Sequence, residues 1–203
     1  MTNIDRLRMS TDGKGIRTLI VAAGCPLRCR YCINPHTWNN ETKVRKFTPE
    51  KLYKFVSVDD IYFKATGGGI AFGGGEPLIY ADFIKEFVDI CPSEWNFLME
   101  TSLNMPWENV KKIIECIDEF YVDIKAYDED IYQQYTGHSG RQAFDNLKRL
   151  LEICPQKVTV RVPIIPDLTT AEDCEGFVEQ LKDIGAVRIN RFIYRVNDLS
   201  DVR

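Results

Sequence analysis

The 203-residue sequence has no long apolar run and no excess of charge of one sign. No segment approaches the ~20 apolar residues of a membrane-spanning helix, and the polar residues 1–10 do not resemble a secretory signal peptide. The formal net charge is −4 and like charges do not cluster, which argues against a general nucleic-acid or membrane-surface role. We therefore expect a cytoplasmic protein without membrane or nucleic-acid partners.

Cysteine is unevenly distributed along the chain. Three of the seven cysteines, Cys25, Cys29 and Cys32, lie close together, whereas residues 33–68 contain none. An odd, clustered set does not suit a disulfide framework and favours a reducing compartment. The spacing lets three thiolates converge from one short loop, one ligand fewer than an iron–sulfur cluster bound only by cysteines uses. One iron of such a cluster would be free to bind another molecule.

The same loop also allows a structural zinc site. Cys29, Cys32 and His36 have a Cys-x2-Cys-x3-His spacing that is compatible with tetrahedral zinc, and Cys25 would complete the set of four ligands. Zinc sites more often combine two separate pairs of ligands, whereas these residues all lie in one loop. The cysteines alone therefore favour a cluster and leave zinc as an alternative.

Short apolar, β-branched segments alternate with longer amphipathic ones along the chain. We expect strands at residues 17–22, 69–72, 96–101, 120–125, 157–164 and 187–193. We expect helices from residue 48 to about residue 64 and at residues 81–90, 107–117, 139–153 and 170–184. Such alternation predicts an α/β domain, spanning residues 1–203, with a parallel sheet and helical crossovers. Six units are too few for a closed eight-strand barrel, which leaves a partial, open barrel or a doubly wound sheet.

Residues suited to ligand binding gather where the expected strands end. The cysteine loop follows the first strand, and the glycine run 73–75 with Glu76 follows the second. Further polar residues end the next three strands: Glu100, Thr101, Asp123, Lys125 and Arg161. Because the carboxyl ends of parallel strands meet at one edge, we expect these residues to surround one site. The glycine run taken alone is equally compatible with a plain turn.

Taken together, the motifs resemble the radical S-adenosylmethionine (SAM) superfamily. The resemblance rests on Cys-x3-Cys-x2-Cys with Tyr31 before the third cysteine, followed by Gly-Gly-Glu-Pro after the next strand. Within the superfamily, the chain resembles the glycyl radical enzyme activating enzymes of the pyruvate formate-lyase activating type. Segments at residues 11–17, 24–29, 34–38, 121–125 and 161–163 are similar to that family's pattern. Without a cysteine-rich insert, the chain resembles the short, single-cluster form.

The resemblance implies a partial TIM-like barrel of about six parallel strands with outer helices. It also implies that Cys25, Cys29 and Cys32 bind a [4Fe–4S] cluster whose fourth iron binds SAM, with Lys125 as a further catalytic residue. The SAM molecule would contact Tyr31 and Asn34 on its adenine side, Gly74, Gly75 and Glu76 at its methionine amino group, Lys125 at its carboxylate, and Thr101, Asp123 and Arg161 in the same site.

The resemblance further implies an anaerobic reaction with two protein partners. SAM would be cleaved reductively to a 5′-deoxyadenosyl radical, which removes a Cα hydrogen from a glycine of a partner glycyl radical enzyme. A flavodoxin- or ferredoxin-type protein would supply the electron. Thiolate-bound clusters reach potentials down to roughly −700 mV, low enough to reduce a sulfonium, while the protein supplies positioning and exclusion of water.

The sequence departs from the family's pattern at two places. Glu100 stands where the family often has an aspartate, and its extra methylene bears on whether a monovalent cation binds near Glu100 and Asp123. Tyr194-Arg195 stands where the family often has a tyrosine–histidine pair near the ribose, and the sequence ends at Arg203.

Two other functions remain as alternatives. One is a radical SAM enzyme that modifies a small molecule or a peptide, similar to the deazaguanine-forming synthases. The other is a zinc-stabilised binding protein. Residues 12–17 and 123–125 favour the activating enzymes over the synthases.

Overall fold

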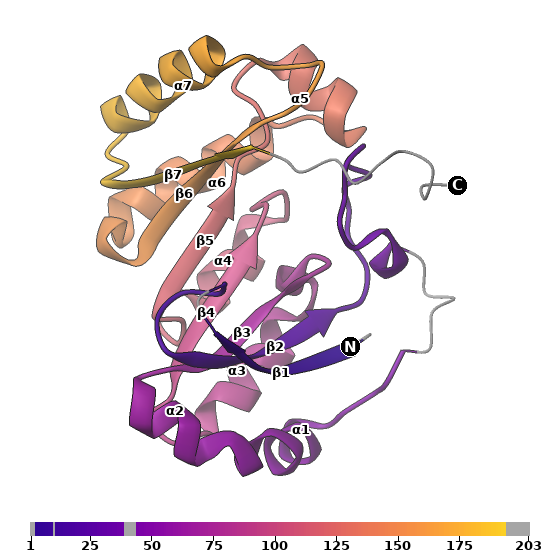
Figure 1. Ribbon diagram of the computed structural model, residues 1–203, viewed down its shortest axis with the longest axis vertical. Coiled ribbons are helices and arrows are strands. Elements are labelled where there is room, and N and C mark those ends of the chain that lie inside the picture. Colours follow the sequence, from indigo (N-terminus) through magenta and orange to yellow (C-terminus); the bar gives the residue numbers. More distant parts are fainter. Residues whose placement is uncertain (1–2, 10, 39–43, 194–203) are drawn as a thin grey trace.

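The computed structural model describes residues 3–9, 11–38 and 44–193, which form a seven-stranded sheet (Figure 1). The strands lie side by side in chain order: β1 (Asn3–Met9), β2 (Ile16–Ala22), β3 (Gly69–Gly74), β4 (Asn96–Thr101), β5 (Glu119–Asp123), β6 (Val158–Ile164) and β7 (Arg188–Ile193). Strands β2 to β7 are parallel, and β1 is antiparallel to β2. Because β1 and β7 do not pair, this sheet stays open. The expected partial barrel of six parallel strands is confirmed.

Helices connect the parallel strands and cover the sheet. They are α1 (Pro49–Val56), α2 (Asp60–Thr66), α3 (Ala81–Asp89), α4 (Trp107–Ile113), α5 (Glu129–Thr136), α6 (Arg141–Ile153) and α7 (Ala171–Asp183). Short 3-10 turns are η1 (Pro35–Thr37), η2 (Ser57–Asp59), η3 (Pro77–Tyr80) and η4 (Pro155–Lys157). In Figure 1, α1 and α2 lie at the β1 end of the sheet and α5 and α7 at the β7 end. Among the helices of the described part, none has the length and apolar character needed to cross a bilayer.

The core forms where apolar helix faces pack on the strands. Ile20 on β2, Phe72 on β3 and Phe120 on β5 are at most 1% exposed. The rings of Phe72 and Phe87 on α3 meet edge to face, with centroids 6.0 Å apart. Strand β3 is buried along almost its whole length, as expected for a central parallel strand covered on both faces. This core holds the carboxyl ends of the strands in fixed positions at one edge.

The helix expected from residue 48 to about residue 64 is wrong as one continuous element. Its start is as predicted, because Thr48 Oγ1 accepts a hydrogen bond from Lys51 N at 3.3 Å. The turn η2 then separates α1 from α2. At this turn the fully buried carboxylate of Asp59 accepts hydrogen bonds from Thr18 Oγ1 at 2.9 Å and from Arg6. These contacts with β1 and β2 fix the break, and they depend on residues far away in the sequence.

Two elements were not expected from the sequence. Strand β1 is polar and mostly exposed, and it is held by backbone pairing with β2 rather than by burial. Helix α5 is short, and its buried face consists largely of Tyr132 and Tyr135. Residues Tyr194-Arg195 and the segment up to Arg203, where the sequence departs from the family's pattern, lie outside the described residues.

Candidate active site

A cavity of about 320 Å³ lies at the carboxyl ends of the parallel strands. Its volume falls within the roughly 300–1,000 Å³ of small-molecule sites. The cavity brings together twelve of the residues expected from the sequence: Cys25, Cys29, Cys32, Asn34, Gly74, Gly75, Glu76, Glu100, Thr101, Asp123, Lys125 and Arg161. Most of these residues lie at the ends of β2 to β5 or in the loops after them, as the parallel topology requires, whereas Arg161 lies in the middle of β6 rather than at the expected strand end.

The cysteine loop rests on the C-terminal turn of α5. Arg28 N donates to Thr136 O at 2.8 Å, and Arg30 N donates to Tyr135 O at 2.9 Å. Next to these anchors, Leu27 and Cys29 pack against Tyr135 in a small apolar cluster that is separate from the main core. Helix α5, which the sequence did not predict, is therefore the support of the loop that carries the thiols.

The three thiols line the same cavity. Among the described residues, no three His, Cys, Asp or Glu side chains are grouped around a single ion, and His36 is exposed. Burial raises the pKa of Cys25 to about 12 and also raises the pKa of Cys29 and Cys32. Metal binding would therefore release protons from these thiols. Three thiols that line one cavity are ligands of the kind that iron–sulfur clusters use.

Glycines let the end of β3 lie directly against the cysteine loop. Gly74 has a φ of 86°, and a Cβ atom at this position would collide with Val21. A Cβ atom at Gly75 would collide with the carbonyl oxygens of Ala22 and Gly24. In addition, Glu76 N donates to Gly24 O at 2.8 Å. The glycine run is thus required by a close backbone approach, and it exposes main-chain groups beside the thiols.

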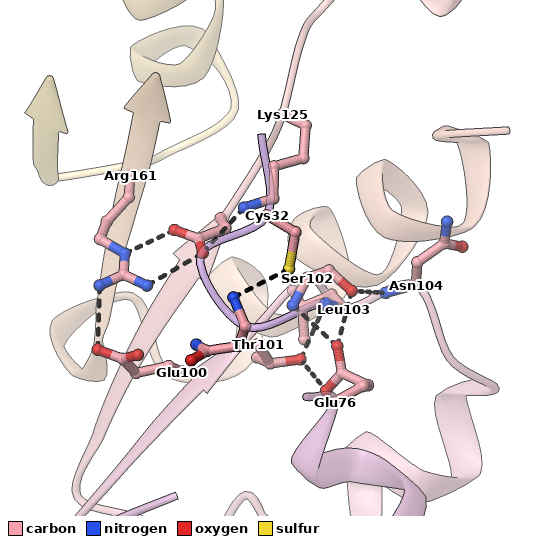
Figure 2. Close-up of polar contacts among 11 residues, drawn as sticks. Cys32, Glu76, Glu100, Thr101, Ser102, Leu103, Asn104, Lys125 and Arg161 are labelled. Atoms are coloured by element: carbon pink, nitrogen blue, oxygen red, sulfur yellow. Dashed lines mark hydrogen bonds and ion pairs between the residues drawn. The ribbon is translucent and has the colours of Figure 1, made fainter. Parts of the chain in front are cut away.

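The carboxylate of Glu76 is fully engaged inside the protein (Figure 2). Its Oε1 accepts from Thr101 Oγ1 at 2.6 Å and from Leu78 N at 3.2 Å. Its Oε2 accepts from Ser102 N at 3.0 Å and from Ser102 Oγ at 2.7 Å. Burial raises the pKa of Glu76, and the four donors oppose this rise. Glu76 and Thr101 therefore tie the turn after β3 to the turn after β4 beside Gly74 and Gly75.

A row of alternating charges forms another wall of the cavity (Figure 2). Arg161 contacts both oxygens of Asp123, at 2.6 and 3.0 Å, and Glu100 Oε1 at 3.0 Å. Lys125 Nζ lies 3.1 Å from Asp123 Oδ2. Although burial alone would raise it, Lys125 and Arg161 lower the pKa of Asp123 to about 2. Asp123 is therefore ionised at neutral pH and holds two cationic side chains at the cavity.

Tyr31 is the predicted site residue that does not line the cavity. Its hydroxyl donates to Asp167 at 3.4 Å, and its ring centroid lies 6.2 Å from that of Tyr135. Its predicted contact with the adenine side remains a prediction.

Other lining residues were not predicted as site residues. They include Arg8, which pairs with Asp12, and Ser102, which binds Glu76. The position of Asp12 in the family-like segment 11–17 and the adjacency of Ser102 to Thr101 were the available signals.

Comparisons with known proteins show the family of the chain. Residues 19–189 match the model of the radical SAM superfamily. The pyruvate formate-lyase-activating enzyme of Clostridium pasteurianum is 35% identical over 162 residues, which cover 80% of this chain and 67% of the relative. The (2S)-3-sulfopropanediol dehydratase activating enzyme of Klebsiella oxytoca is 27% identical over an alignment of 250 positions. The alignment covers 90% of this chain and 77% of the relative.

Similarity to solved structures supports the fold. The crystal structure of Streptococcus suis SuiB bound to S-adenosylmethionine matches with a TM-score of 0.68 at 14% identity. The match covers 89% of this chain but only 40% of that chain. The chain therefore belongs to the radical SAM superfamily, and within it resembles the glycyl radical enzyme activating enzymes.

Proposed function

We propose that this protein cleaves SAM reductively and thereby removes a Cα hydrogen from a glycine of a partner glycyl radical enzyme. The observation that carries the proposal is the shared cavity, in which three cysteines face the glycine backbone of β3 and the Asp123–Lys125 pair. The relatives named above are both activating enzymes, which supports the same class of partner.

The residues of the cavity have distinct roles in this proposal. Cys25, Cys29 and Cys32 hold a [4Fe–4S] cluster, which when bound supplies the electron that splits SAM into methionine and a 5′-deoxyadenosyl radical. Lys125, which Asp123 holds in place, binds the methionine carboxylate. The main-chain groups of Gly74 and Gly75 accept hydrogen bonds from the methionine amino group. The surrounding walls limit the access of water to the reacting atoms.

The row of charged side chains bears on whether a monovalent cation binds near Glu100 and Asp123, a question that the sequence leaves open. In this structure the guanidinium of Arg161 lies between Glu100 and Asp123 and supplies a positive charge there. A monovalent cation beside these carboxylates remains a prediction. The electron donor in this proposal is a flavodoxin- or ferredoxin-type protein, and the partner is a glycyl radical enzyme such as a pyruvate formate-lyase or a sulfopropanediol dehydratase.

Electron paramagnetic resonance on a mixture of proteins tests the proposal. The protein is reconstituted anaerobically with iron and sulfide, reduced with dithionite, and mixed with SAM and candidate glycyl radical enzymes. We expect about four irons per chain and a glycyl radical doublet on one partner. Formation of 5′-deoxyadenosine with no radical on any partner would favour an enzyme that modifies a small molecule or a peptide. A colourless protein that binds zinc but never iron would contradict both radical functions.

A further inference from the structure

Side chains of the cysteine loop point alternately to its two sides. Cys25, Leu27 and Cys29 line the cavity. Pro26 instead lines a separate hollow of about 400 Å³, and Arg28 and Arg30 are exposed. A single stretch of backbone therefore separates the thiols from the outer surface of the protein.

The outer side of the cysteine loop carries positive charge. Arg28 and Arg30 flank Cys29 in the sequence, and His138 and Arg141 line the hollow together with Pro26. Within the described part of the chain, Arg28, Arg30 and Arg141 form no ion pair with a carboxylate. Several other arginines do form such pairs: Arg6, Arg8, Arg17, Arg161 and Arg191. Three guanidinium groups that form no ion pair among the described residues thus lie along the outer side of the cysteine loop and in the adjoining hollow, in a chain whose net charge is −4.

The arginines of the loop are ordered by contacts other than ion pairs. Arg28 Nη1 donates to Cys25 O at 2.6 Å and to Leu27 O at 2.9 Å, and the guanidinium lies 5.6 Å from the ring centroid of Trp38. The guanidinium of Arg30 lies 5.3 Å from the ring centroid of Tyr31. These contacts position the side chains and leave their charge uncompensated, so that an anionic partner surface could bind them.

We propose that this outer face, formed by Pro26, Arg28, Arg30, His138 and Arg141, binds a small acidic electron-carrier protein with a flavin or an iron–sulfur centre. The inference rests on the proposed function, because it requires a cluster at the three cysteines. One electron leaves the carrier's centre and one electron enters the cluster, and no bond is formed or broken in this step. Because the face lies across the loop from the cavity, the carrier can bind while the cavity holds its ligands.

A charge-reversal variant tests this docking face. Arg30→Glu combined with Arg141→Glu reverses two charges, while Arg28 is kept because it also braces the loop. The matched control combines Lys111→Glu with Lys182→Glu. Both lysines are exposed, in the last turns of α4 and α7. Those helices run antiparallel to the strands, so that their last turns lie away from the cavity edge.

The first readout is the affinity for an acidic flavodoxin, measured by calorimetry at low and high salt with cluster-free and with reconstituted protein. We expect the Arg30/Arg141 variant to bind roughly tenfold more weakly at low salt and to lose most of the salt dependence, whereas the control binds within about twofold of the wild type. Equal affinity of the variant and the wild type at low salt would overturn the proposal. If the double variant fails to fold, Arg30→Gln combined with Arg141→Gln is measured instead, with a smaller loss expected.

The second readout separates this inference from the proposed function. Dithionite reduces the cluster without docking, so its yield of 5′-deoxyadenosine should be the same in the wild type, the variant and the control. With reduced flavodoxin as donor, the yield should fall only in the variant, and an unchanged yield would overturn the proposal. If the wild type gives no 5′-deoxyadenosine with dithionite, the proposed function fails, and the affinity measurement still decides whether the face binds the carrier.

Discussion

Glu76 and Asp123 are both acidic residues at the cavity, and their partners give them different tasks. Glu76 is 1% exposed and accepts four hydrogen bonds from the turns around it, so that it stabilises the backbone. Asp123 contacts Arg161 and Lys125, whose side chains also line the cavity. Asp123 therefore positions charges that a ligand can reach. The pairing with Arg161 could not be inferred from sequence spacing alone, since Arg161 lies on β6.

Replacing Cys29 tests the ligand assignment. Cys29→Ala should abolish assembly of the cluster, because only two thiols would remain in the cavity, while the protein stays folded and soluble. Cys154→Ala is the matched control, since Cys154 is also buried but lies at the end of α6. The check is the iron content after anaerobic reconstitution, with circular dichroism as the measure of folding. Normal iron content in Cys29→Ala would rule out this cysteine as a required ligand.

Asp123 should make a pH-dependent contribution to stability. Its pKa is lowered from 3.8 to about 2, so the contribution is present above pH ~4 and is lost as the pH falls through about 2. We expect Asp123→Asn to lower the free energy of unfolding by about 2 kcal/mol at pH 7 and by less at pH 3. The control Asp82→Asn changes a 77% exposed side chain and should cost less than about 0.5 kcal/mol. Urea unfolding at both pH values measures the difference, and an equal loss at both would contradict this account of Asp123.

Among the elements, α5 has the closest link to the site. Its last turn accepts the backbone hydrogen bonds of the cysteine loop, and its Tyr135 packs against Leu27 and Cys29. The sequence pattern did not predict this helix, because it is short and its buried positions are largely tyrosines. It likewise did not predict β1, whose polar residues are held by pairing rather than by burial. Strong apolar periodicity, in contrast, predicted all six parallel strands.

Shortening Leu27 tests this role of α5. Leu27→Ala removes a side chain that is 1% exposed and should cost about 2–5 kcal/mol of stability. Because Leu27 lies between Cys25 and Cys29 in the sequence, the reconstituted variant should also release iron faster than the wild type. Leu147→Ala on α6 is the control, because Leu147 is fully buried in the main core and should cost as much without changing iron release. The measurement is urea unfolding together with iron release to a chelator. Equal release from both variants would argue against α5 as the support of the loop.

For the whole molecule, the parallel order of the strands accounts for most of the site. Residues as distant as Cys25 and Arg161 line one cavity, because the loop after β2 reaches the same edge of the sheet as the end of β5, where Asp123 pairs with Arg161 on β6. That convergence could be predicted from alternating elements and motif positions. Three other features could not be predicted from the sequence: the hydrogen bonds of the Glu76 carboxylate inside the protein, the pairing of Arg161 with Glu100 and Asp123, and the arginines on the outer side of the cysteine loop, which form no ion pair with any described residue. Each depends on which side chains the folded sheet brings together.

In the proposed function, the protein uses SAM to remove a hydrogen from a glycine of another protein. Isotope transfer tests it most directly. A partner glycyl radical enzyme is produced with deuterated glycine and incubated anaerobically with the reduced protein and SAM, and the 5′-deoxyadenosine is analysed by mass spectrometry. The account predicts that the product gains one deuterium atom. Product that stays unlabelled, although the partner carries deuterium at its glycines, would contradict it.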